Sequence, residues 1–276
     1  MIFKVLLRKA IYRFCSKPFF WIIFKKFRND FDIFCFHRVL PLEEFEKLTD
    51  KEKEFAVTTD FFQAFLEFLS TRYEFCNLNE GMQNHDHKKQ KCHITFDDGY
   101  LDNLNYALPI LEKFSAPATI YISDGIISRS ITSTDHTCSA DINKFLTWDD
   151  VRELDKSNLV EIAGHTHSHA MLSMLSGVDL VSEIDLSKSN IEYELGHKIE
   201  HFAFPYGGKG TFNRDAINVI KDSGYKSAAT VICKKTNFAE NPFEIPRYFV
   251  THKCTEQINF SRLSGISNFL NHKLLP

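Results

Sequence analysis

The chain has 276 residues, of which 43% are hydrophobic and 25% are charged, and this ordinary globular composition excludes wholesale disorder. Its formal net charge of −3 argues against a protein that is basic throughout for nucleic-acid binding. The seven cysteines are scattered without a CxxC spacing, which favours free thiols in a reducing compartment and hence a cytoplasmic location.

The first element in chain order is a basic amphipathic segment, to which we assign residues 1–30. Residues 1–28 contain eight basic side chains and no acidic one, and five apolar residues would line one face of a helix: Phe3, Leu7, Ala10, Ile11 and Phe14. The longest uncharged run, 18–24, is far shorter than the roughly 20 residues that span a bilayer. Two interpretations stay open: peripheral contact of residues 1–28 with the anionic inner face of a membrane, or a helix packed on the protein with its charges in water.

Beyond this segment, apolar runs that predict strands alternate with periodic runs that predict helices. The expected strands are 32–39, 92–97, 118–123, 159–163, 201–204, 226–232 and 244–250. The expected helices are 59–71, 103–114, 148–155, 178–195 and 212–223, with Thr59 and Thr147 capping the first and third. Two polar stretches, 77–91 and 128–141, are expected to be loops. This alternation indicates βαβ units and a mainly parallel sheet, and it favours one open or distorted barrel over two domains.

Two adjacent carboxylates follow one of these strands. The run CHITFDDGY, residues 92–100, leaves the strand at Asp97 and Asp98. Neighbouring carboxylates repel each other, so one of them needs a cation beside it. Because α/β folds place their sites at the carboxyl ends of strands, this pair is a candidate site; the alternative is an ordinary Asp-Asp-Gly turn.

Three histidines follow a second strand, in the run GHTHSH at residues 164–169. His165 and His169 are four residues apart, so on a helical turn they would share a face while His167 would point away. The spacing suits two ligands of one zinc ion, with an oxygen ligand such as Asp98 and a water completing the shell. A chance His-rich loop is the alternative, but the carboxylate pair at another strand end favours a metal.

A third run, HFAFPYGG at residues 201–208, places Tyr206 and two glycines after another strand. Backbone N–H groups there could face a ligand, although a plain turn has the same pattern. Together the three runs resemble the polysaccharide deacetylase family, the NodB-homology carbohydrate esterases, through TFDDGY, HTHSH and FAFPYG. Softer support comes from CFHRV at 35–39, VTTDF at 57–61, LTW at 146–148 and IPR at 245–247.

The resemblance implies an α/β fold, a distorted (β/α)7 barrel in a single domain over residues 31–255, with a tail at 256–276. It also implies metal-dependent removal of the N-acetyl group from an N-acetylated sugar in a poly- or oligosaccharide. The implied cofactor is Zn²⁺ or another divalent transition metal.

The resemblance further implies a role for each motif residue. The first Asp of the family motif corresponds to Asp97 and acts as the base that takes a proton from the attacking water. Asp98, His165 and His169 correspond to the metal ligands. Tyr206 corresponds to the motif tyrosine, whose backbone N–H helps to hold the oxyanion.

The sequence departs from the family pattern in two places. Ala203 stands where many members have an arginine, and we expect Arg247 to approach Asp97 from a neighbouring strand instead. Many members end with a Leu-x-His element that supplies a general acid; we do not assign that role to the Leu-Asn-His run at 270–272, which lies beyond the residues that carry the resemblance. We therefore assign the acid to His37 on the first strand, as in members that look circularly permuted, with His252 as the fallback.

The intact set of base and metal ligands favours an enzyme over a non-catalytic glycan-binding relative, which has no need of a base. Among enzymes, the alternative is a deformylase or another amidase that acts on a lipid-linked sugar. The expected partner is an N-acetylated saccharide, and the membrane hypothesis would make it a lipid-linked or nascent chain at the inner membrane face. No nucleic acid is expected as a partner.

Overall fold

The computed structural model describes residues 31–83, 90–130, 144–232, 238 and 240–254. The amphipathic segment expected at residues 1–30, the tail at 256–276 and most of the loop expected at 128–141 lie outside the described residues. The domain boundaries drawn from the sequence therefore stay predictions.

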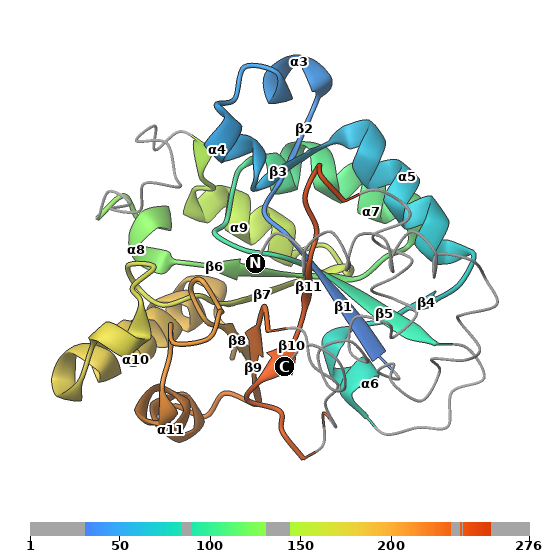
Figure 1. Cartoon of the computed structure of the whole chain (residues 1–276). Coiled ribbons are helices and arrows are strands. Elements are labelled where there is room, and N and C mark those ends of the chain that lie inside the picture. Colours follow the sequence, from blue (N-terminus) through green and yellow to red (C-terminus); the bar gives the residue numbers. More distant parts are fainter. Residues whose placement is uncertain (1–30, 84–89, 131–143, 233–237, 239, 255–276) are drawn as a thin grey trace, which may run out of the picture.

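Parallel strands form a nearly closed barrel with helices around it, as expected for a distorted (β/α)7 barrel (Figure 1). The order across the sheet is β10-β9-β8-β7-β6-β5-β1-β11. The short strand β4 pairs with the first two residues of β5, before the residues of β5 that pair with β6. The strands are β1 (Phe31–Phe36), β4 (Glu74–Phe75), β5 (Lys91–Phe96), β6 (Ala118–Ile122), β7 (Val160–Gly164), β8 (His201–Ala203), β9 (Ser227–Thr230), β10 (Ile245–Pro246) and β11 (Tyr248–Phe249).

The barrel closes through a strand that is broken in the middle. The sequence predicts one strand over 244–250, but the structure splits it into β10 and β11 with Arg247 between them. β10 pairs with β9, whereas β11 pairs with β1 at the opposite edge of the sheet. Among the described residues, β10 and β11 counted as one strand, together with β1 and β5 to β9, make the seven strands of the expected barrel. Arg247 thus lies at the seam where the two edges meet.

The helices pack on the outside of these strands (Figure 1). They are α5 (Thr59–Ser70), α6 (Leu78–Met82), the π-helix η2 (Asn103–Ala107), α7 (Leu108–Phe114), α8 (Asp124–Ile127), α9 (Trp148–Asp155), the 3₁₀ turn η4 (Leu172–Met174), α10 (Gly177–Leu195) and α11 (Arg214–Asp222). All five expected helices are present, but the one expected over 103–114 begins as a π-helix. Helix α6 is a correction, because the polar stretch 77–91 was expected to be a loop.

A small two-stranded unit lies beside the barrel, above β1 in Figure 1. It comprises β2 (Arg38–Leu40) and β3 (Ala56–Thr58), joined through α3 (Leu42–Phe45) and α4 (Asp50–Lys53). The strand expected over 32–39 is therefore interrupted at His37, where the chain leaves the barrel sheet for this unit.

Burial and capping explain why these segments adopt these forms. Every residue of β1, β5 and β6 is buried, as parallel strands covered on both faces require. Thr147 caps α9 through a capping box, as expected. The cap of α5 was expected at Thr59 and is instead Thr58, whose side chain accepts the N–H of Phe61 at 3.2 Å.

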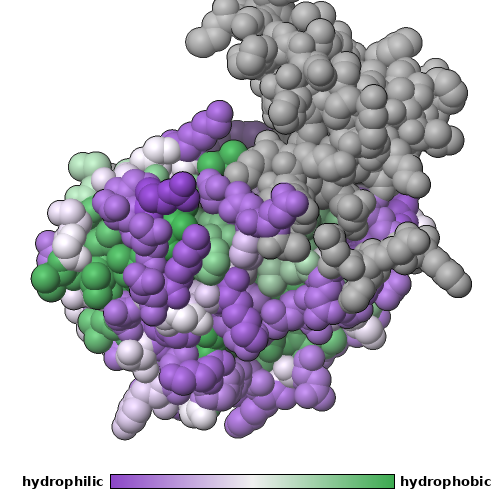
Figure 2. All heavy atoms as spheres, turned by 90° about the horizontal axis from the view of Figure 1, so that it is seen from below, coloured by the Kyte–Doolittle hydropathy of each residue, from purple (hydrophilic) through white to green (hydrophobic). Residues whose placement is uncertain are grey.

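The surface is mostly hydrophilic, with hydrophobic atoms at the left of the face in Figure 2. In Figure 1 helix α10 lies on that side, and it exposes Val178, Val181 and Leu186. Within the described residues, no helix combines the length and the hydropathy that a membrane span requires.

Candidate active site

The predicted site residues meet in one cavity at the carboxyl ends of the strands. The cavity has a volume of about 100 Å³. Its lining contains His37, Phe55, Asp97, Asp98, His165, His169, Tyr206, Val231 and Phe249. The position agrees with the rule that parallel α/β folds place their sites where the strands end.

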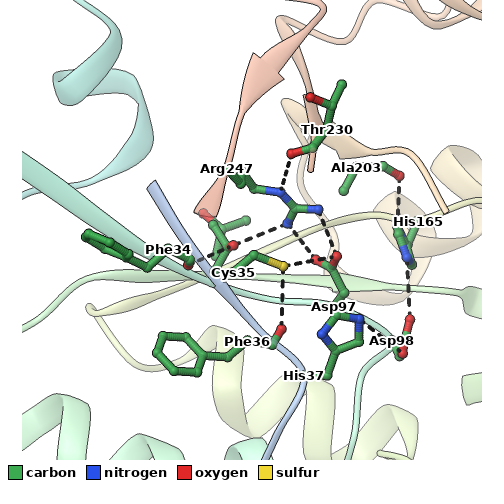
Figure 3. Close-up of polar contacts among 12 residues, drawn as sticks. Phe34, Cys35, Phe36, His37, Asp97, Asp98, His165, Ala203, Thr230 and Arg247 are labelled. Atoms are coloured by element: carbon green, nitrogen blue, oxygen red, sulfur yellow. Dashed lines mark hydrogen bonds and ion pairs between the residues drawn. The ribbon is translucent and has the colours of Figure 1, made fainter. Parts of the chain in front are cut away.

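Asp97 is buried and paired with Arg247, as the sequence led us to expect. The guanidinium donates two hydrogen bonds to the carboxylate, from Nη1 to Oδ1 at 2.6 Å and from Nη2 to Oδ2 at 2.8 Å (Figure 3). Burial by itself would raise the pKa of Asp97, but the charge and hydrogen bonds of Arg247, together with the nearby His165 and His37, outweigh burial and lower that pKa. Asp97 is therefore a carboxylate, the state that a base requires.

Cys35, one of the scattered cysteines, also contacts Asp97. The thiol Sγ lies 3.4 Å from Asp97 Oδ2 (Figure 3). Burial raises the pKa of Cys35 well above its ordinary value, so the sulfur keeps its proton and donates it to the carboxylate. One oxygen of Asp97 thus accepts from both Arg247 and Cys35.

Asp98, His165 and His169 converge as a metal site would. One ligand atom from each lies within 4.8 Å of the other two. Asp98 Oδ1 is 3.4 Å from His165 Nε2 and 3.3 Å from His169 Nε2. This buried oxygen nevertheless accepts no hydrogen bond of normal geometry among the described residues. Burial would raise the pKa of Asp98, but His169 and His37 hold it well below its usual range.

The ring of His165 is oriented by the backbone of the residue that replaces the family arginine. Its Nδ1 lies 2.8 Å from the carbonyl oxygen of Ala203, so Nδ1 carries the proton and donates it (Figure 3). Nε2 is then left as a lone pair that faces Asp98. This is the tautomer that a metal-binding histidine adopts, so the donor set fits a divalent cation.

The histidines do not meet on a helical turn, which corrects the sequence interpretation. Residues 165–170 form neither a helix nor a strand. Thr166 and His169 have left-handed backbones, with φ of 64° and 59°. Asp98 and Tyr206 are also left-handed, at 75° and 62°. Non-glycine residues with such angles are uncommon and concentrate at functional sites, where the surrounding structure holds them.

His167 points away from the ligand pair, as expected. Its Nδ1 bonds Asp124 Oδ2 at 2.9 Å, and Asp124 also accepts from Asn190 on α10. The neighbouring Ser168 donates both its N–H and its hydroxyl to the carboxylate of Glu183, at 2.9 and 2.7 Å. Helices α8 and α10 therefore hold the histidine loop from behind.

His37 lies in the cavity, whereas His252 lies outside its lining. His37 Nε2 is 3.9 Å from Asp98 Oδ2. His252 instead bonds the backbone oxygen of Lys53 through Nδ1 and packs against Phe45. Burial lowers the pKa of His37 and Asp98 opposes that effect, so the net direction favours a neutral ring. The protonated form expected of an acid must therefore arise during the reaction or at lower pH.

Tyr206 lies at the mouth of the cavity. It is 43% exposed, and its ring centre is 5.1 Å from that of His169. Gly207 follows with φ of 57°, and a Cβ there would lie 3.0 Å from the backbone nitrogen of Val231. The turn therefore needs glycine at this position.

Sequence reasoning missed the apolar wall of the cavity. Phe55 and Phe249 place their ring centres 5.2 and 5.1 Å from that of His37, and Val231 also lines the space. The only available signal was the position of Phe249 beside the Ile-Pro-Arg run. Phe55 lies in a region with no periodic pattern and could not have been singled out.

Taken together, the cavity holds a buried carboxylate fixed by arginine, a second carboxylate with two histidine nitrogens, and the imidazole of His37. Such a set can take a proton from water, hold a divalent cation and deliver a proton to a leaving group. The small volume and apolar wall suit a short acyl group.

Comparisons with known proteins identify relatives of one family. A family model described as polysaccharide deacetylase matches residues 84–228, more than half of the chain. The Bacillus subtilis protein YxkH, named for the same family, is 29% identical over 137 residues, which are 50% of this chain and 43% of that protein. A poly-beta-1,6-N-acetyl-D-glucosamine N-deacetylase of Staphylococcus aureus is 24% identical over 220 residues, 75% of this chain and 71% of that protein.

Solved structures share the fold. The deacetylase PplD of Streptococcus pyogenes, solved in complex with acetate, matches with a TM-score of 0.69 at 20% identity, over 84% of this chain and 97% of that one. IcaB of Ammonifex degensii matches with a TM-score of 0.67 at 20% identity, over 85% and 97%. At this level of identity the likeness concerns the barrel alone.

Proposed function

This chain belongs to the polysaccharide deacetylase family, hydrolases of the amide bond in N-acetylated sugars, and from that membership we propose that it removes N-acetyl groups from a glycan with Asp97 as the base. The observation that carries the proposal is the buried, arginine-paired carboxylate of Asp97 beside Asp98 in one cavity. The relative in Staphylococcus aureus is named for a polymer of N-acetylglucosamine, which makes such a polymer the first substrate to test.

In the proposed reaction, Asp97 takes a proton from a water molecule that attacks the amide carbonyl. The backbone N–H of Tyr206 donates to the developing oxyanion, and such a donor typically contributes about 3 kcal/mol. His37, which must first be protonated, passes that proton to the sugar nitrogen as the carbon–nitrogen bond breaks. The products are acetate and a free amine.

We further propose that Asp98, His165 and His169 hold a divalent metal, with Zn²⁺ the first candidate because the donors are one carboxylate and two imidazoles. When bound, the ion would polarise the carbonyl and lower the pKa of the attacking water. Metal analysis of the purified protein tests this proposal. We expect one ion per chain in the wild type and almost none in the His165→Ala, His169→Ala double variant; full retention there would refute the assignment.

The activity is tested by incubating the metal-loaded protein with N-acetylated glucosamine oligomers and with N-formylated analogues. Released acetate and formate are then measured separately. Acetate release that a chelator abolishes supports the proposal. Release of formate alone would support the deformylase alternative, and saccharide binding without release of either acid would indicate a non-catalytic relative.

A further inference from the structure

We propose that Asn103 and Asp102 are positioning residues that hold the backbone of His37 in place for proton transfer. The proposal rests on the proposed role of His37 as the general acid. It assigns a task to two buried residues that touch neither the cavity nor the metal ligands.

The ring of His37 has little of its own to hold it. Its Nδ1 is buried and accepts or donates no hydrogen bond among the described residues, and its Nε2 is 3.9 Å from Asp98 Oδ2. The remaining ring contacts are the edges and faces of Phe55 and Phe249. Aromatic contacts confine the ring sideways but do not fix its position along the strand direction. The backbone of His37 must therefore set that position.

The backbone at His37 is also where the sheet stops supporting it. β1 ends at Phe36, whose carbonyl still accepts the N–H of Asp97 at 3.0 Å. β2 begins at Arg38 and pairs with β3 instead. The chain changes sheets at His37, and the hydrogen bond to the carbonyl oxygen of His37 comes from a side chain. Asn103 Nδ2 donates to that oxygen at 2.8 Å.

Asp102 fixes the next two residues through both of its oxygens. Oδ1 accepts the backbone N–H of Val39 at 2.9 Å, and Oδ2 accepts from Arg38 Nε at 2.8 Å. The side chains are almost fully enclosed: Asp102 is 4% exposed, Asn103 1% and Arg38 8%. Buried charge-assisted bonds of this kind are strong and geometrically specific.

These contacts join two walls of the site. Asp102 and Asn103 follow Asp98 by four and five residues, and Asn103 opens the π-helix η2. Short π-helical turns are frequent at functional sites. The chain segment that carries the base therefore also holds the acid, so the distance between them is set by this pair of residues and not by the barrel ladder alone.

The test compares Asn103→Leu, which removes the donor but keeps the approximate shape, with His37→Ala and the double variant. The matched control is Asn213→Ala, which removes a side-chain bond to the backbone at the start of α11, away from the cavity. Turnover is measured on an N-acetyl sugar amide and on an activated acetyl ester, whose leaving group needs no proton. Metal content and thermal unfolding are recorded for each variant.

Asn103→Leu should lower kcat on the amide about 10–100-fold, because an acid displaced by an ångström loses efficiency, and should change ester turnover only about twofold. In the His37→Ala background, Asn103→Leu should have no further effect on the amide. Asp102→Asn should shift the amide rate in the same direction. Equal losses on both substrates, or additive losses with His37→Ala, would overturn the proposal.

Failure of the proposed acid, His37, can be distinguished from failure of the positioning role alone. If His37→Ala itself shows no preference for the ester, the proposed acid is wrong and the positioning role goes with it. If His37→Ala shows that preference but Asn103→Leu behaves like Asn213→Ala, the proposed function stands and only the positioning role is lost.

Discussion

At the scale of single residues, Arg247 is expected to have a large effect on stability. Its guanidinium is 1% exposed and neutralises the buried carboxylate of Asp97. Removing one partner of a buried ion pair leaves the other charge uncompensated, so Arg247→Leu should lower the free energy of unfolding by about 3–5 kcal/mol. Urea denaturation of the variant against the wild type measures this loss.

Arg152 supplies the matched control, because its ion pairs with Asp149 and Glu194 lie at the surface. Arg152→Leu should cost at most about 1 kcal/mol. Equal costs for the two substitutions would mean that the Arg247–Asp97 pair is not the buried, coupled pair that the geometry indicates.

Site residues that belong to short sequence motifs could be predicted from the sequence. The pairing of Arg247 with Asp97 could be expected because Ala203 left the place of an arginine empty and an Ile-Pro-Arg run was available. The histidine loop could not, because the spacing of His165 and His169 fits a helical turn equally well. No glycine marks the left-handed angles of Thr166 and His169, which only the packed loop reveals.

At the scale of elements, helix α10 supports the histidine loop. Glu183 accepts both donors of Ser168, the residue that precedes His169. Direct outer partners of metal ligands typically contribute 10–100-fold in metal affinity; because Glu183 holds the residue next to the proposed ligand His169, we expect Glu183→Gln to weaken binding of Zn²⁺ by up to about 10-fold. Calorimetric titration of the metal-free protein measures the affinity.

The control is Glu194→Gln on the same helix, where the carboxylate pairs with Arg152 and not with the loop. Its metal affinity should equal that of the wild type. An unchanged affinity in Glu183→Gln would show that the loop holds its shape without α10.

A row of polar residues crosses five adjacent strands at the other end of the barrel: His93, Thr119, Glu161, His201 and Ser227. Burial raises the pKa of Glu161 from 4.5 to about 7. Burial also lowers the pKa of His93 to about 3 and that of His201 to about 4, so both rings stay neutral near pH 6. Between about pH 4.5 and 7, Glu161 is therefore mostly protonated in the folded chain and mostly ionised in the unfolded chain.

This shift gives a pH dependence of defined sign. As pH rises from about 4.5 to about 7, the unfolded state loses the Glu161 proton first, so the free energy of unfolding falls. Allowing for screening of a side chain that is one-third exposed, the fall should be about 1–2 kcal/mol. Glu161→Gln should remove it, whereas Glu112→Gln, an exposed change on α7, should not. The free energy of unfolding is measured by urea denaturation at several pH values. If the idea is wrong, its pH dependence will be the same for Glu161→Gln and for the wild type.

Long, periodic elements could be predicted and short or broken ones could not. The five expected helices and the alternation of strands and helices that indicates a mainly parallel sheet follow from apolar periodicity. The break at Arg247 depends on two different pairing partners far away in the chain, β9 and β1, which no local pattern encodes. Helix α6 is only five residues long, too short for a period to be visible.

For the molecule as a whole, we propose that residues 1–28 hold the protein at an anionic membrane surface. Each basic residue near such a surface contributes about 1 kcal/mol to the free energy of membrane binding, and salt weakens this electrostatic contribution. Full-length protein should sediment with anionic liposomes at low salt, and a chain lacking residues 1–28 should not. If both stay in the supernatant, the membrane proposal and the inner-face location should be dropped.

The proposed chemistry of the whole molecule depends on Asp97 acting as a base in a folded site that holds a metal ion. The most direct measurement is acetate release from an N-acetylglucosamine oligomer by wild type and by Asp97→Asn, with metal content and thermal unfolding recorded for both. We predict equal amounts of acetate and free amine from the wild type, and a rate lower by roughly 10²–10⁴-fold in a folded, metal-containing Asp97→Asn. A variant that deacetylates as fast as the wild type would contradict the assignment of Asp97 as the base.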